Sequence, residues 1–189
     1  MLPSTKQWVA LACLGLAGLT LIERSSAQGQ ADAPPFREFR VASSVKRHFM
    51  TISPVWLPPI TMDHGKDPSG PNVIHLECDV HATRNNPNGF AFGEWIPYLT
   101  VTWRLEPLTA DGGAKQEAME GRFHAMVARD GPHYGVTIRM PGKGRYKLTY
   151  SLRPPTENGF GRHTDPVTGV DPWWEPFEVE FQWDFPGHP

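Results

Sequence analysis

Four residues that can bind metal ions alternate along one short segment of the chain. His75, Glu77, Asp79 and His81 form the pattern H-x-E-x-D-x-H within a stretch that otherwise has the composition of a β-strand. Because successive side chains of a strand point to opposite faces, these two imidazoles and two carboxylates line the same face. Alternating charge also occurs on ordinary solvent-facing strands, but imidazole is the commonest protein metal ligand near neutral pH. The pattern therefore predicts a metal site on this face.

Two further segments carry side chains that could join such a site. Met126 lies in an expected strand and His133 follows it across the turn Asp130-Gly131-Pro132, so a hairpin could bring the thioether and the imidazole to one spot. His163 lies in a loop with two glycines, which let the backbone approach a site closely. Taken separately, Met126 is typical core filler and His163 a surface histidine. Beside imidazoles, however, thioether sulfur favours copper, and nearby carboxylates favour harder ions such as Fe(II) or Mn(II).

The sequence offers little support for a hydrolase. It contains no G-x-S-x-G elbow and no phosphate-binding glycine loop before a helix. Glu77 and Asp79 could form a glycosidase pair, but a separation of roughly 7 Å on one strand and the flanking histidines fit a metal site better. Cys78 points to the other face with Leu76 and Val80, so we expect it to be a small buried apolar residue rather than a ligand.

The elements that must position these residues are short strands. Apolar and polar residues alternate in strand-length runs, and turn-forming Gly, Pro, Asn and Asp separate the runs. The runs are residues 73–81, 96–105, 124–128, 134–140, 146–152 and 177–185. With 20 Pro and 18 Gly, the chain leaves little room for helices. We predict seven or so strands in a single all-β domain over residues 45–189, an antiparallel immunoglobulin-like β-sandwich.

The last run predicts which face of its sheet is buried. Between Phe177 and Phe185 every second residue is aromatic or valine, and the residues between them are acidic or amide side chains. This alternation is typical of a sheet with one wet side, so the aromatic face is core. Trp173 and Trp174, in the loop before this run, could cover the end of the core, bind a sugar or form an interface; we favour core cover.

Residues 1–27 have the layout of a secretory signal peptide. A basic residue precedes the apolar residues 8–22, and small residues end the segment before Gln28. The alternatives are a membrane-spanning helix, for which the apolar run is short, and a lipoprotein cut before Cys13. We predict cleavage, a mature chain that begins near Gln28, and a flexible leader over residues 28–44.

Composition limits the possible partners. The formal net charge of the 189 residues is −2, and loss of residues 1–27 removes two basic residues and one acidic residue, which leaves 16 basic and 19 acidic residues. No basic stripe remains to bind nucleic acid. No second apolar run is long enough to enter a membrane, so we expect a mature protein that is not membrane-embedded. Cys78 is then the one remaining cysteine, so an intrachain disulfide cannot form.

Five motifs, in their order and spacing, resemble the FetP-like family of periplasmic iron-uptake proteins, the Fe(II) transport proteins. The motifs are H-L-E-C-D-V-H-A (75–82), N-P-N-G-F (86–90), G-E-W-I-P-Y-L (93–99), M-V-A-R-D-G-P-H-Y-G (126–135) and G-F-G-R-H (159–163). The resemblance covers roughly residues 45–185. It implies a homodimeric immunoglobulin-like β-sandwich in the bacterial periplasm, working beside a high-affinity iron permease of the inner membrane.

The resemblance also implies a copper site, which would be formed by His75, Glu77, Met126, His133 and His163. It further implies that Glu77 and Asp130 hold an iron or manganese ion displaced slightly from the copper position, since harder ions prefer oxygen. Whether His163 comes from the same subunit stays open. Three residues depart from the family pattern: Cys78 stands where a small residue such as Ala is usual, Arg129 adds a positive charge beside Asp130, and His64 is an extra imidazole.

We therefore expect a periplasmic metal-binding accessory protein that captures Fe(II), binds copper at the same site and assists iron uptake through the permease. The residues favour binding over turnover. One alternative is a mononuclear copper or iron oxidase that acts on Fe(II) during import, and another is a copper-tolerance binding protein. A sugar-binding sandwich that uses Trp173 and Trp174 is a third alternative.

Overall fold

The computed structural model describes residues 37–63, 67–113 and 116–187. The predicted signal peptide, residues 28–36 of the predicted leader, and His64 lie outside the described residues. Within the described part of the chain, no helix is both long and apolar enough to cross a bilayer.

Strands make up almost all of the regular structure. In chain order the described elements are β1 (Phe39–Arg40), β2 (Val45–Arg47), β3 (Met50–Leu57), β4 (Val73–Ala82), β5 (Thr100–Pro107), β6 (Met119–Arg122), β7 (His124–Ala128), β8 (Gly131–Arg139), β9 (Gly144–Arg153), the single-turn 3-10 helix η1 (Pro155–Asn158) and β10 (Phe177–Phe185). All strand pairs between these elements are antiparallel.

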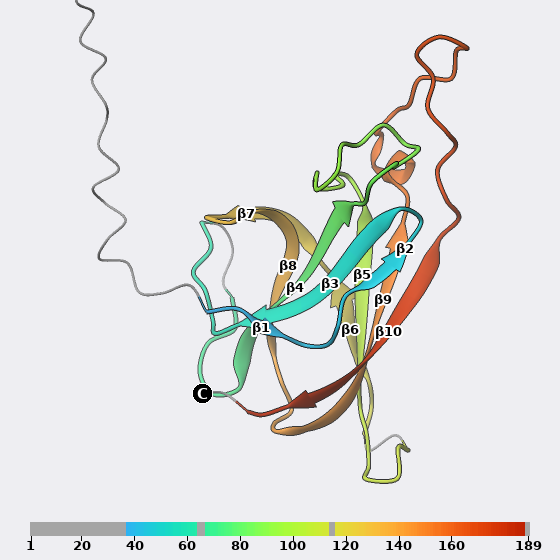
Figure 1. Ribbon diagram of the computed structural model, residues 1–189. Helices are drawn as coiled ribbons and strands as arrows, with labels where there is room; N and C mark the ends of the chain where they lie inside the picture. Colours follow the sequence, from blue (N-terminus) through green and yellow to red (C-terminus); the bar gives the residue numbers. More distant parts are fainter. Residues whose placement is uncertain (1–36, 64–66, 114–115, 188–189) are drawn as a thin grey trace, which may run out of the picture. The chain divides into compact units, whose positions relative to one another are not determined.

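The strands form two sheets that lie face to face (Figure 1). Sheet A has six strands in the order β1-β3-β4-β8-β7, with β2 also paired to β3, and sheet B has four strands in the order β10-β9-β5-β6. The chain is thus an antiparallel immunoglobulin-like β-sandwich, and the predicted fold class is confirmed.

The core lies between the two sheets and follows the alternation in the sequence. On β10 the side chains of Val179, Phe181 and Trp183 are buried, and the residues between them are exposed. On β4 the inward side chains are buried, and those of Leu76 and Cys78 have no exposed surface. The prediction that Cys78 faces the core is confirmed.

The tryptophan pair covers one end of this core. Trp174 is partly buried and packs against the core, and Trp173 makes an edge contact with it at 5.6 Å between ring centroids. Trp173 also lies against Phe90 and Phe160. These contacts support the cover role that we favoured for both indoles.

Strand β3 was not predicted from the sequence, because Pro54 interrupts it. Proline removes a ladder hydrogen bond and is normally excluded from strands with neighbours on both sides. The structure resolves the conflict, since β2 pairs with β3 up to Ile52 and β1 pairs with it from Val55 onward. Pro54 therefore lies where the partner of β3 changes from β2 to β1, and on that side its carbonyl accepts a hydrogen bond from the Val41 amide at 3.0 Å.

The start of β5 also differs from the prediction, which placed it at Ile96. The strand begins at Thr100, because Pro97 cannot donate a hydrogen bond and Tyr98 has a φ of 60°. Strand β6 was not predicted either. At the N-terminus, β1 and the buried Val41 lie within the stretch predicted as leader, so the sandwich begins before residue 45.

Candidate metal centre

The outer face of sheet A brings together candidate metal ligands from two neighbouring strands. His75 and Glu77 lie on β4, and His133 lies on β8. Glu77 pairs with Gly135 across the ladder, so His133, two residues earlier on β8, is on the same face and diagonal to Glu77. Register alone thus places one carboxylate beside two imidazoles.

The three side chains converge on one point. Glu77 Oε1 is 3.5 Å from His75 Nε2 and 3.2 Å from His133 Nε2. The potential ligand atoms all lie within 4.8 Å of one another, and the two imidazole rings are nearly perpendicular. All three residues are buried, with at most 5% of their surface exposed.

Hydrogen bonds at Nδ1 orient both rings. His133 Nδ1 lies 3.3 Å from the carbonyl oxygen of Gly131, which can only accept, so Nδ1 carries the proton. His75 Nδ1 is bonded to Thr137 Oγ1 at 3.2 Å. Burial lowers the pKa of His133. Burial and the nearby charge of His133 together lower the pKa of His75 to about 4. The neutral His133 ring held in this way directs its Nε2 lone pair toward Glu77, and His75 Nε2 faces the same carboxylate oxygen.

Neither Nε2 atom has a hydrogen-bond partner among the described residues. His75 Nε2 and His133 Nε2 are both buried, and nothing in the described chain donates to or accepts from either atom. Buried polar groups are normally satisfied, so each unpaired nitrogen requires an explanation. Two neutral imidazole nitrogens and a carboxylate oxygen facing one another form a donor set that suits a divalent cation.

The surrounding charges also favour a cation. Burial and then the charges of Asp79, Asp130 and Glu38 raise the pKa of Glu77 to about 8. Burial, Glu38 and Asp130 raise the pKa of Asp79 to about 7. Clustered carboxyl groups repel one another when ionised, and a bound positive ion would relieve that repulsion.

Met126 approaches the cluster over a glycine. It pairs with His133 in the β7–β8 ladder. A Cβ atom built on Gly135 would lie 2.5 Å from His75 Nε2 and 2.9 Å from Met126 Sδ, so both ligand atoms lie over the bare backbone of this glycine. The absence of a side chain at Gly135 thus leaves the space that a metal site with a thioether ligand requires.

Two of the predicted ligands are not brought into the cluster. Asp130 lies at the exposed tip of the β7–β8 hairpin and affects Glu77 through its charge. His163 lies in an exposed loop, where its Nδ1 is bonded to Thr168 Oγ1 at 2.8 Å. Asp79 and His81, which share the outer face of β4, also lie outside the group of three.

Three contributors to the site were not predicted. Gly135 supplies space, Thr137 orients His75, and Glu38 adds negative charge from just before β1. A glycine inside a strand was the one available signal, because such a glycine often marks a close approach. Thr137 and Glu38 had no signal of their own, since their roles depend on strand register.

Comparisons with known proteins identify the family of this chain. A family model described as "Fe2+ transport protein" matches residues 35–187. A UPF0423 protein of Brucella abortus (strain 2308) is 43% identical over 143 residues, which cover 73% of this chain and 76% of the relative.

Solved structures show the same fold with related sequences. FetP of uropathogenic Escherichia coli strain F11, recombinantly expressed in the periplasm of E. coli, is 42% identical with a TM-score of 0.74, and the match covers 82% of this chain and 100% of FetP. The copper-reconstituted P19 protein of Campylobacter jejuni is 40% identical with a TM-score of 0.74, over 82% of this chain and 99% of P19. With nearly the whole sandwich matched, this chain belongs to the Fe2+ transport protein family.

Proposed function

We propose that this protein is a periplasmic accessory of iron uptake that captures Fe(II) and binds copper at the same centre, and that it passes iron to an inner-membrane permease. His75, Glu77 and His133 would hold the ion, with Met126 beside them. The observation that carries the proposal is the pair of buried Nε2 atoms that face one Glu77 oxygen without a hydrogen-bond partner. The copper-bound state of P19 supports copper as one of the ions.

The donor set explains how one centre could serve two kinds of metal. Imidazole nitrogen and thioether sulfur suit copper, whereas carboxylate oxygen suits Fe(II) and Mn(II). Glu77 would change its share by rotating between coordinating and free positions, and Asp130 would add charge for the harder ion. A Glu77→Ala variant with unchanged affinity for both copper and manganese would rule this role out.

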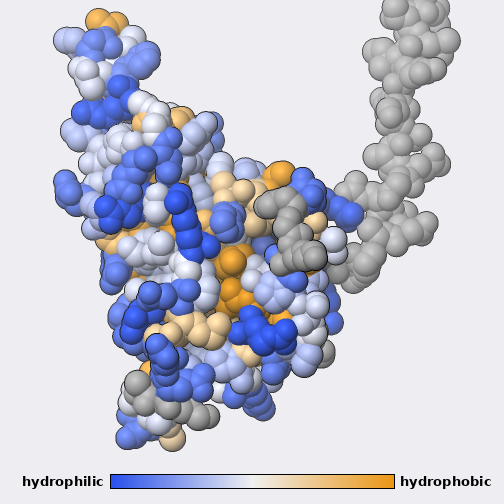
Figure 2. Space-filling view, turned by 180° about the vertical axis from the view of Figure 1, so that it is seen from behind, coloured by the Kyte–Doolittle hydropathy of each residue, from blue (hydrophilic) through white to orange (hydrophobic). Residues whose placement is uncertain are grey.

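We infer that His163 completes the centre from a second copy of the chain. Its loop, residues 159–176, projects from the end of the sandwich (Figure 1), and Asp165 braces the loop by accepting hydrogen bonds from the Val167 and Thr168 amides. His163 is exposed, and no hydrogen bond among the described residues engages its Nε2. Apolar surface near the middle of the face in Figure 2 offers a further area for a homodimer contact.

The first experiment measures metal content and affinity of the chain from Gln28 for Cu(II), Fe(II) and Mn(II). We expect about one ion per chain for wild type and none for a His75→Ala/His133→Ala variant. A His48→Ala/His81→Ala variant removes the same number of imidazoles outside the cluster and should bind as wild type does. Equal binding by all three proteins would contradict the proposed centre. Oxygen consumption with Fe(II) at catalytic protein levels would instead indicate an oxidase.

The second experiment tests whether His163 acts across a dimer. The His75→Ala and His163→Ala variants are unfolded together, refolded as a mixture and titrated with Cu(II). If His163 comes from the partner copy, a mixed dimer regains one complete site, and the mixture binds copper more tightly than either variant alone. Affinity that is no higher than that of the separate variants would show that the ligand is not shared.

A further inference from the structure

A pocket lined by basic side chains and flanked by two aromatic rings lies at the tips of two loops, away from the candidate metal centre. Its volume is about 620 Å³. We call it the basic–aromatic pocket; its lining includes Lys46, Arg47, His48, Phe49, Arg84 and Phe92. No acidic residue lines it, although the whole chain has a net charge of −2. Among the described residues, no ion pair engages its lysine or either arginine.

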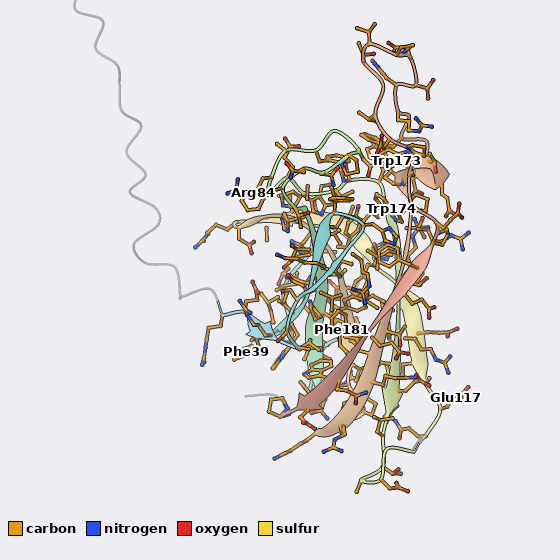
Figure 3. The ribbon with its side chains drawn as sticks, turned by 45° about the vertical axis from the view of Figure 1, so that its right-hand side comes forward. Phe39, Arg84, Glu117, Trp173, Trp174 and Phe181 are labelled. Carbon is orange, nitrogen blue, oxygen red and sulfur yellow. The ribbon has the colours of Figure 1, made fainter. Side chains whose placement is uncertain are left out.

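The aromatic rims are exposed to an unusual degree for large apolar side chains. Phe49, in the turn between β2 and β3, is 53% exposed, and Phe92, in the loop between β4 and β5, is 65% exposed. Arg84 lies over the Phe92 ring at 4.5 Å from its centroid. Figure 3 shows Arg84 pointing outward at one side of the molecule, in the same upper half of the view as Trp173 and Trp174.

The Phe49 rim is held in place by hydrogen bonds to the loop after β4. The carbonyl of Phe49 accepts hydrogen bonds from the Thr83 amide at 2.8 Å and from Asn86 Nδ2 at 3.1 Å, which ties the β2–β3 turn to the loop after β4. His48 and Phe49 form that turn with φ values of 46° and 58°. Such left-handed conformations are uncommon for residues other than glycine, and they persist where surrounding contacts enforce them. The pocket is therefore built before any partner arrives.

We propose that the basic–aromatic pocket docks this protein onto a membrane surface that contains anionic phospholipid. Basic side chains are attracted to the headgroup phosphates, and exposed aromatic rings insert at the boundary with the acyl chains. Charge complementarity selects an anionic partner, and two half-exposed phenylalanines on opposite rims select lipid over a soluble acidic segment, which would leave both rings in water. The inference does not depend on which metal the chain binds.

This docking would place the metal cluster close to the bilayer but outside it. Strand β4 carries Glu77 and leads directly to Thr83 in the pocket lining. The six residue steps from Glu77 to Thr83 span roughly 20 Å at about 3.3 Å per residue. The protein would therefore approach the membrane with the end of the sandwich that carries the pocket, which is also the end from which the loop of residues 159–176 projects (Figure 1).

The test is sedimentation of the chain from Gln28 with lipid vesicles. We expect binding to vesicles of equimolar phosphatidylglycerol and phosphatidylcholine, and none to pure phosphatidylcholine. Each cation near an anionic surface strengthens binding about fivefold, so Lys46→Gln/Arg47→Gln/Arg84→Gln should weaken it on the order of a hundredfold. Phe49→Ser/Phe92→Ser should also weaken it, by about tenfold or more, because the rings no longer insert.

The matched control removes three exposed arginines from sheet B, by Arg104→Gln/Arg122→Gln/Arg145→Gln, and should keep most of the binding. Near-ultraviolet circular dichroism of every variant checks that the sandwich is intact. The proposal is overturned if wild type does not sediment with anionic vesicles, if the control loses as much binding as the pocket variants, or if the phenylalanine variant binds as wild type does. Tight binding of an oligoglutamate peptide without vesicle binding would assign the pocket to an acidic protein segment instead.

Discussion

The outer faces of the two sheets both carry charged residues, yet these residues behave in opposite ways. On sheet B, Lys147 lies 2.8 Å from Glu106, and hydrogen bonding from Lys147 lowers the pKa of that carboxyl. On sheet A, Glu77 is buried beside two imidazoles and other carboxyls, and its pKa is raised to about 8. No lysine or arginine of the described chain pairs with it.

The contrast shows how alternating charge can be interpreted. Exposed, oppositely charged neighbours satisfy one another and require no further partner, so the face of sheet B is an ordinary solvated surface. Buried carboxylate and imidazole groups without a cation leave a deficit of positive charge, and a metal ion would fill it. A candidate metal site therefore differs from an ordinary solvated surface in lacking a positively charged partner for its carboxyl groups, and not in the alternation of charged residues along the strand.

The largest expected effect comes from filling the space over Gly135. A Gly135→Ala variant places a Cβ 2.5 Å from His75 Nε2, and the displaced imidazole should lower Cu(II) and Mn(II) affinity on the order of a hundredfold. The matched change on sheet B is Gly121→Ala, whose Cβ would lie 2.9 Å from the Trp103 ring. That variant should lose about 1–3 kcal/mol of stability and keep its metal affinity. Chelator competition and urea unfolding measure the two quantities, and equal affinities would contradict the role of Gly135.

Removing the thioether should have a smaller and metal-selective effect. Met126→Ala is expected to weaken copper binding by on the order of tenfold and to leave manganese binding nearly unchanged, because sulfur is the softer ligand. Met119 on β6 packs against the core and is the control, since Met119→Ala should change stability alone. Titrations with both metals test this, and an equal loss for copper and manganese would remove Met126 from the ligand set.

The pH dependence of stability should distinguish the two carboxyl types. The pKa of Glu77 rises from 4.5 to about 8 on folding, so this group stabilises the metal-free protein most below pH 4.5 and less as pH rises toward 8. The lowered pKa of His75 acts in the opposite direction, but only below pH 6.5. Wild type should therefore lose about 1 kcal/mol more between pH 7 and 8 than Glu77→Gln, which keeps only the smaller contribution of Asp79, whose pKa is raised to about 7. Urea midpoints in chelator measure this difference, and identical slopes for the two proteins would contradict the raised pKa.

The smallest effect is expected on sheet B. Lys147→Gln removes contacts to Glu106 and Glu180, but such exposed pairs contribute less than about 1 kcal/mol, and salt screens them. Unfolding at low and high salt should differ less for the variant than for wild type. A change in metal affinity would show that the two faces are coupled, contrary to our interpretation.

The strands that the sequence predicted well are those with strict alternation. β10 matches its predicted bounds from Phe177 to Phe185, and β4 matches to within one residue. β3 was missed because the effect of Pro54 depends on where β1 and β2 end, which is a property of pairing between distant segments. The local sequence pattern therefore predicts which face of a strand is buried, but it does not predict which strands pair with one another.

For the candidate site too, the local sequence pattern predicted some positions, and others depended on the pairing of distant segments. The positions of His75 and Glu77 followed from period two on a single strand, and the hairpin predicted that Met126 and His133 would lie together, as they do. Diagonal approach of His133 to Glu77 required the register between β4 and β8. The placement of His163 outside the cluster could not be derived from spacing, since loop direction depends on tertiary contacts.

The inward direction of Cys78 has a consequence for redox chemistry. This thiol lies between Glu77 and Asp79 in the chain, yet it faces the core, has no exposed surface, and burial raises its pKa well above the usual value. Thiolate, rather than thiol, binds metals and is readily oxidised. The alternation of side chains along β4 thus keeps the Cys78 sulfur, which could act as a reductant, on the opposite face of the strand from the proposed copper ligands. A one-residue slip of this strand would turn the sulfur onto the metal face and expose it to oxidation.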